Sequence, residues 1–175
     1  MKTGFAIWLT GLPASGKTTL ARGLANVLEQ AGLPVQVLDS DHLRRVLTPE
    51  PTYSREERDW FYRVMVFVGQ LLVQNGVNVV FAATAGRRSY RDEARATLDR
   101  FAEVYVLCSL ETCMARDTKG VYQKALQGEA TTVPGLQVPY EVPEHPEVTV
   151  DTEAQSPAEG VQTIFDRLEA LGWLS

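Results

Sequence analysis

Gly11-Leu12-Pro13-Ala14-Ser15-Gly16-Lys17-Thr18 is the stretch that decides the fold of this 175-residue chain. It matches the pattern G-x-x-x-x-G-K-[ST] and lies between an apolar run at 5–9 and a helical pattern at 17–31. Glycines in such a loop let backbone N–H groups approach phosphate oxygens, and the following helix adds positive potential at its N-terminus. The lysine supplies a mobile charge, and the hydroxyl of Thr18 is placed to reach a Mg²⁺ ion at the terminal phosphates. The stretch therefore predicts a nucleoside triphosphate-binding loop.

Apolar runs alternate with helical patterns along the rest of the chain. Runs with the length of buried strands occur at 5–9, 35–38, 77–83, 104–107 and 148–150. Helical spacing or capping signals occur at 17–31, from about 42, and at 54–76, 87–100, 111–117 and 156–171. The alternation predicts an α/β fold of the P-loop NTPase type, with three layers (α/β/α) and a mainly parallel five-stranded sheet. Ligands of such sheets bind at the carboxyl ends of the strands.

No linker, repeat or low-complexity segment divides residues 1–175, so we expect a single domain. At this length folding buries roughly 70% of the surface of the unfolded chain, which is enough for a core without disulfides. Glycines and prolines at 120–146 indicate a partly mobile loop there. We expect Trp8, in the apolar run at 5–9, and Trp60, in the apolar series at 54–76, to lie in the core.

The charge balance restricts the partners. Twenty-two acidic against seventeen basic residues give a net charge of −5, which argues against nucleic acid and anionic membranes as partners.

The run at 5–9 is too short for a signal segment or a membrane span. Cys108 and Cys113 have no second pair with which to build a zinc site, so we expect buried reduced thiols and a cytoplasmic protein.

The loop alone leaves kinase, GTPase and motor ATPase open. The chain has no N-K-x-D segment for guanine, and its small size disfavours a motor. Asp39 and Asp41 follow the run at 35–38, where a carboxylate can accept a proton from an attacking hydroxyl or hold a metal-bound water. Two turn or capping acids are the alternative interpretation of this pair.

Further segments resemble the adenylylsulfate (APS) kinase family. Asp39-Ser40-Asp41-His42-Leu43-Arg44 is similar to D-G-D-x-x-R, and Tyr53-Ser54-Arg55-Glu56-Glu57-Arg58 to F-S-x-x-D-R. Residues 91–95 resemble R-D-E-A-R, residues 116–125 resemble R-D-P-K-G-L-Y-K-K-A, and 139–144 and 150–152 continue the resemblance in order. The resemblance implies transfer of the γ-phosphoryl group of MgATP to the 3′-hydroxyl of APS, giving PAPS and ADP, in sulfate assimilation.

The resemblance also implies roles for the matching residues. ATP would bind to residues 11–18, Thr19 and Arg116, and Mg²⁺ to Thr18 and Asp41, partly through water. Asp41, Lys17 and Lys119 would be catalytic, with Lys119 in a lid at about 116–146. APS would contact Asp39, Asp41, Arg44, Tyr53, Arg58 and Lys119. The family further implies a homodimer and a functional link to an ATP sulfurylase.

Three residues depart from the family pattern near the acceptor. Phe61 stands at an asparagine position, Ala85 where many members carry a serine that can be phosphorylated, and Val133 at the lid aromatic that stacks on adenine. In-line transfer from ATP needs no phosphoserine, so activity is compatible with Ala85. Losing a base-aromatic stack costs about 1–3 kcal/mol of binding. Two alternatives stay open: a related kinase for another nucleotide-like or small anionic acceptor, and a non-catalytic ATP-binding regulatory module.

Overall fold

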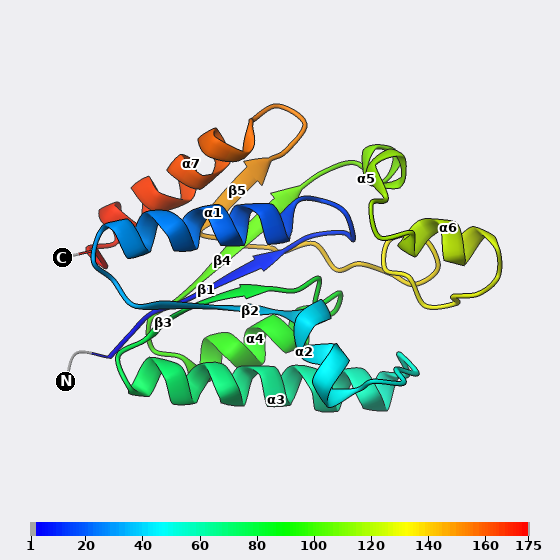
Figure 1. Cartoon of the computed structure of the whole chain (residues 1–175), viewed down its shortest axis with the longest axis horizontal. Helices are drawn as coiled ribbons and strands as arrows, with labels where there is room; N and C mark the ends of the chain where they lie inside the picture. Colours follow the sequence, from blue (N-terminus) through cyan, green and yellow to red (C-terminus); the bar gives the residue numbers. More distant parts are fainter. Residues whose placement is uncertain (1–2, 175) are drawn as a thin grey trace.

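The computed structural model describes residues 3–174, which form a parallel sheet between two layers of helices (Figure 1). The strands of this part of the chain are β1 (Ala6–Thr10), β2 (Val35–Asp39), β3 (Asn78–Ala82), β4 (Phe101–Leu107) and β5 (Val148–Asp151). They pair in the order β2-β3-β1-β4-β5, all parallel. The helices are α1 (Lys17–Gln30), α2 (Ser40–Leu47), α3 (Arg55–Gln74), α4 (Arg88–Thr97), α5 (Leu110–Arg116), α6 (Val121–Leu126) and α7 (Pro157–Ala170).

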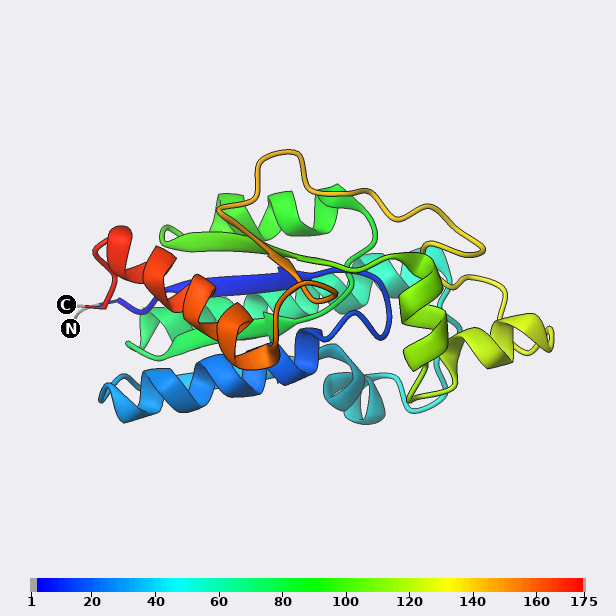
Figure 2. The ribbon, with the colours of Figure 1, turned by 90° about the horizontal axis from the view of Figure 1, so that it is seen from above.

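Helices α1 and α7 cover one face of the sheet, and α3 and α4 cover the other (Figures 1 and 2). Alternate side chains of β1 enter the two cores: Ile7 and Leu9 pack with α1 and α7, and Trp8 packs toward α3 and α4. Every residue of β1 is buried, as expected for a central strand covered on both faces. The predicted α/β/α fold with a five-stranded parallel sheet is confirmed.

The carboxyl ends of the strands point toward the end of the molecule that carries α2, α5 and α6 (Figure 1). The phosphate loop follows β1 there, and Asp39 ends β2. Helices α5 and α6, with the irregular segment after α6, extend beyond this edge of the sheet (Figure 2). Because polar segments far apart in the sequence meet at this edge, it is the place to examine for a functional site.

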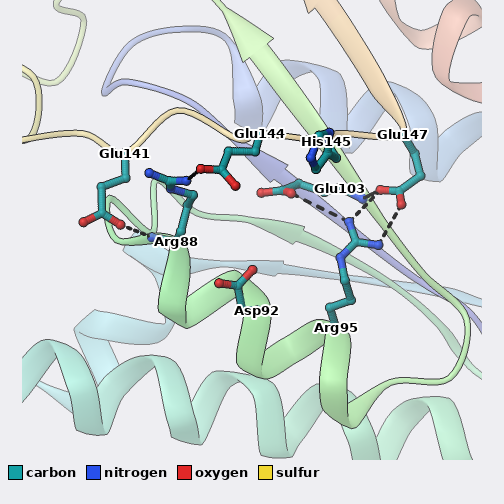
Figure 3. Close-up of a pocket in the computed structure, with 8 residues that line it drawn as sticks. All are labelled: Arg88, Asp92, Arg95, Glu103, Glu141, Glu144, His145 and Glu147. Atoms are coloured by element: carbon teal, nitrogen blue, oxygen red, sulfur yellow. Dashed lines mark hydrogen bonds and ion pairs between the residues drawn. The ribbon is translucent and has the colours of Figure 1, made fainter.

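The segment 139–147 returns from this end to β5 and is attached to α4 (Figure 3). The backbone N–H of Arg88 donates to Glu141 Oε2 at 2.7 Å, and the Arg88 side chain pairs with Glu144. Arg95 holds Glu147 through two hydrogen bonds of 2.7 and 2.9 Å. Arg88 and Arg95 therefore fasten the segment to the helix, and Arg95 also pairs with Glu103 of β4 at 3.7 Å (Figure 3).

Two local predictions were wrong. The segment 120–146, expected to be a loop, contains α6, a helix too short for its apolar periodicity to be evident. Trp8 is buried as predicted, but Trp60 is 46% exposed. Helix α3 has apolar residues on both sides, and the side that carries Gly69 is the buried one. The helix approaches the sheet so closely there that a Cβ on Gly69 would lie 2.3 Å from Cζ of Phe81. Among residues 3–174 no helix has the length and hydropathy needed to cross a membrane.

Candidate active site

The loop between β1 and α1 has the backbone that a phosphate cradle requires. Gly16 has a φ of 105°, and a Cβ on Gly11 would lie 2.5 Å from the carbonyl oxygen of Val106. Two side chains from distant segments support the loop: Tyr122 donates to the Pro13 carbonyl at 2.9 Å, and Thr152 donates to the Ser15 carbonyl at 3.0 Å. Sequence reasoning assigned no role to either residue, although both lie in segments that resemble the family.

The amine of Lys17 lies across this loop. Its Nζ donates to the carbonyl oxygens of Gly11 at 3.0 Å and of Leu12 at 2.7 Å. Burial lowers the pKa of Lys17 to about 8, against the opposing influence of Asp41. A phosphate group beside the amine would favour the charged form, so the loop is adapted to an anion.

The hydroxyl of Thr18 donates to Asp39 Oδ2 at 2.8 Å. The other carboxylate oxygen of Asp39 caps α2 by accepting the N–H groups of Asp41 and His42. The capping interpretation of this acid is therefore correct, and the same side chain also lies beside the loop. A hydroxyl and carboxylate oxygens next to a phosphate loop are the hard donors that Mg²⁺ takes together with nucleotide phosphates. The residues present fit that ion.

Asp41 and Lys119 meet at the mouth of the site. Asp41 lies in the first turn of α2, and Lys119 comes from the short connection between α5 and α6. Their side chains form an ion pair while each stays about half exposed, at 54% and 56%. A surface cavity beside the pair is lined by residues of α1, β2 and α2, including Thr18, Asp39 and Arg45. Two of the predicted catalytic residues, 78 positions apart, are thus brought into contact.

Three predicted acceptor residues form one cluster, which we name the acceptor clamp: Arg44, Tyr53 and Arg58. The Tyr53 ring centre lies 4.9 Å from Cζ of Arg44 and 5.7 Å from Cζ of Arg58. Arg58 also donates through Nη2 to the carbonyl and hydroxyl oxygens of Thr132, at 2.8 and 3.1 Å. The clamp therefore combines two cations with an aromatic ring and contacts the segment after α6.

Arg116 and the cysteines lie near the carboxyl ends of β4 and β5. Arg116 donates to the hydroxyl of Thr152 at 3.0 Å and to its carbonyl oxygen at 2.8 Å, which places the guanidinium next to the residue that supports the phosphate loop. Cys108 and Cys113 are buried free thiols, as predicted. Burial is the main cause that raises the pKa of Cys113, to about 12.

The three residues that depart from the family pattern are all buried, at 0% exposure for Phe61 and Ala85 and 5% for Val133. Ala85 has a φ of 41°, its N–H donates to the Tyr62 hydroxyl, and its carbonyl accepts from Arg91. Val133 packs in a small cluster with Tyr122 and Leu136. These positions support the site from beneath and present no polar side chain to it.

The phosphate loop on a parallel sheet, with an acid and a lysine at its mouth, defines a P-loop kinase. The family model described as adenylylsulphate kinase matches residues 3–151. The chain belongs to the adenylylsulphate kinase family.

Relatives with experimental or curated descriptions agree with this assignment. The adenylyl-sulfate kinase of Rippkaea orientalis is 42% identical over 98% of this chain and 95% of its own length. The solved structure of the Mycobacterium tuberculosis APS kinase CysC in complex with AMPPNP and APS is 32% identical, with a TM-score of 0.91 over 97% of this chain and 99% of that one. A probable bifunctional SAT/APS kinase 2 of Sorangium cellulosum is 39% identical over 98% of this chain and 30% of its own.

Proposed function

We propose that this chain is an APS kinase, which transfers the γ-phosphoryl group of MgATP to the 3′-hydroxyl of APS. The observation that carries the proposal is the contact of Asp41 with Lys119 beside the Thr18–Asp39 pair, at the mouth of the phosphate loop. In this arrangement Asp41 would serve as the proton acceptor and Lys119 as the cation for the transferring phosphoryl group, which supports the proposal. The relatives named above carry the same activity in their names.

The donor half of the site consists of the loop residues 11–18, Thr19 and Arg116. Backbone N–H groups of the loop and Lys17 would hold the phosphates, with Arg116 lying over the base. Thr18 would hold Mg²⁺, with Asp39 beside it and Asp41 reaching it through water. When bound, Mg²⁺ supplies neutralisation of phosphate charge.

The acceptor half consists of Asp41, Lys119 and the acceptor clamp, with Asp39 at its edge. Arg44 and Arg58 would hold the phosphosulfate, because a guanidinium can bind such an anion with two parallel hydrogen bonds. Tyr53, 42% exposed, would stack on the adenine in place of the lid aromatic that is valine here. Asp41 would take the proton of the 3′-hydroxyl, and Lys119 would move onto the transferring phosphoryl group.

The test is ADP release from MgATP with and without APS, with the nucleotide product identified by chromatography. The unmodified protein should release ADP only with APS and form PAPS. Asp41→Ala should lose at least 100-fold in turnover while it keeps its affinity for ATP, and Asp166→Ala, on the exposed side of α7, should match the unmodified protein. ATP binding with no stimulation by APS would refute the proposal, and trials of other anionic alcohols would then separate a different acceptor from a regulatory module.

We further propose that residues 1–175 act as one domain in which 116–146 is the lid. Lys119 and Thr132, both in this segment, contact Asp41 and Arg58. Deleting the connection around Gly128, which has open space beside its Cα, should leave the fold intact and expose bound nucleotide to solvent. Unchanged hydrolysis of ATP by water in that variant would contradict the role of a lid.

We also propose a homodimer. Trp60, Phe67 and Leu71 form an exposed row on α3, with 46%, 56% and 46% of their areas accessible, and such a row favours burial against a second copy. Light scattering should give twice the monomer mass, and Phe67→Glu should give the monomer. The proposal also includes a functional link to an ATP sulfurylase. It further includes a cytoplasmic location, because thiols stay reduced there and both cysteines are free.

A further inference from the structure

Glu57, in the first turn of α3, receives hydrogen bonds from two other segments. Its Oε1 accepts the N–H of Thr52 at 2.8 Å and the Thr52 hydroxyl at 3.2 Å, and its Oε2 accepts the N–H of Tyr53 at 2.9 Å. The same Oε2 accepts Arg44 Nη1 at 3.3 Å. Desolvation alone would raise the pKa of Glu57, but these hydrogen bonds and Arg44 lower it overall, so the group is a carboxylate at neutral pH.

The backbone of Tyr53 needs this support. Tyr53 has a φ of 54°, in the left-handed region that is unfavourable for a residue with a Cβ. Glu57 holds the N–H of Tyr53, and Arg58 Nε donates to the carbonyl oxygen of Tyr53 at 3.0 Å. The N–H and the carbonyl group of Tyr53 are therefore both held, and its ring lies near both guanidinium groups of the acceptor clamp.

The guanidinium of Arg44 is also held from two directions. Glu57 pairs with one of its nitrogens, and the ring centre of Phe61 lies 3.8 Å from its Cζ. The Arg44 side chain is only 9% exposed, so this stacking is desolvated and at the strong end for a cation–π contact. Phe61 is one of the three departures from the family pattern, and its ring occupies the space beneath the arginine.

We propose that Glu57 and Phe61 are positioning residues of the acceptor site, which fix Arg44 and Tyr53 for an anionic adenine nucleotide without touching it. This inference rests on the proposed function and adds to it two residues that neither bind the substrate nor react with it. Glu57 sets the position of both clamp residues through its carboxylate, and Phe61 sets the plane of the Arg44 guanidinium. A planar guanidinium in a fixed plane can form two parallel bonds to a phosphosulfate only in the correct orientation.

Steady-state kinetics with each substrate varied in turn test the assignment. Glu57→Gln keeps the size of the side chain but presents an amide to N–H groups, so the KM for APS should rise at least tenfold while the KM for ATP stays within twofold. Glu57→Asp should recover part of the loss. Phe61→Leu should raise the KM for APS about fivefold, whereas Phe61→Tyr keeps the ring and should change it less than twofold. Glu56→Gln removes a neighbouring exposed carboxylate of the same turn and serves as the matched control.

The outcomes separate the possible explanations. If Glu57→Gln acts only by weakening α3, the active fraction and the melting temperature fall while both KM values stay unchanged, and the positioning role is overturned. An equal rise in the KM for ATP and for APS overturns it as well. If the unmodified protein forms no PAPS, the proposed function fails and takes the clamp assignment with it, whereas PAPS formation with an unchanged KM for APS in both Glu57→Gln and Phe61→Leu overturns the positioning role alone.

Discussion

Raising the pH from 7.5 to 9.5 should weaken ADP binding by about 25-fold, because Lys17 loses its charge in the free protein. Burial lowers the pKa of this lysine to about 8 from its ordinary value of 10.5. Roughly three quarters of the free molecules carry the ammonium at pH 7.5, and about 3% carry it at pH 9.5. A bound diphosphate keeps the amine protonated, so the affinity follows the protonated fraction of the free protein.

The control must separate Lys17 from its charged neighbours. Asp41, Cys113, Lys119 and Asp39 all act on the amine electrostatically, and Cys113, with a pKa raised to about 12, stays a neutral thiol in this range. Lys17→Met removes the titrating amine and should bind ADP weakly, with an affinity that is flat from pH 7.5 to 9.5. Isothermal titration calorimetry in two buffers of different ionisation enthalpy should show uptake of nearly one proton on binding at pH 9.

Constant affinity in the unmodified protein, or an equally steep loss in Lys17→Met, would refute this reasoning.

The same pKa shift also predicts how the stability of the protein depends on pH. The folded state holds the proton less tightly than the unfolded state, so charged Lys17 destabilises the free protein in full below about pH 8. This penalty disappears as the pH rises from about 8 to 10.5, and thermal melting at both ends of that window measures it.

Three further changes test other parts of the structure. Gly69→Ala places a Cβ 2.3 Å from Cζ of Phe81 and should cost about 1–3 kcal/mol of unfolding free energy in urea, and no loss would mean that the ring can move aside. Arg91→Met leaves Glu103 buried without its 2.5 Å partner and should cost about 3–5 kcal/mol, of which Glu103→Gln in the same chain should restore part. Lys119→Ala should lower kcat by about 100-fold or more and change ADP affinity less than threefold, and equal losses in both would contradict its role in the transition state.

Signals that lie within a few residues predicted most of the fold. The phosphate loop, the five apolar runs that form strands and the start of the last helix at Ser156 all depend on neighbours in sequence, and the structure has them. The buried side of α3 depends instead on what packs against it. Apolar residues occur on both sides of this helix, and the side that faces the sheet carries Gly69 against the ring of Phe81.

The candidate site likewise contains residues that local motifs predict and contacts that only the structure shows. Motifs identified Lys17, Asp41 and Lys119, because each belongs to a short pattern of residues. The supporting contacts join segments with no common pattern: the hydroxyl of Tyr122 and the carbonyl of Pro13 are 109 positions apart. In the sequence Glu57 belongs to the segment 53–58 that resembles the family, and it stands three residues after Ser54. The structure shows Ser54 accepting the N–H of Glu57, while the Glu57 carboxylate accepts hydrogen bonds from Thr52 and Tyr53.

The segment that we propose as a lid contacts both halves of the proposed site. Lys119 neutralises Asp41 on the phosphoryl side, and Thr132 accepts the hydrogen bonds of Arg58 on the acceptor side. This ion pair engages the carboxylate that the proposal assigns to the proton of the 3′-hydroxyl. Binding of the triphosphate offers Lys119 a stronger anion, which would free Asp41 only when the donor is in place. In the proposed mechanism, the movement that brings Lys119 onto the phosphoryl group would also release the Asp41 carboxylate, so that the two groups would act together.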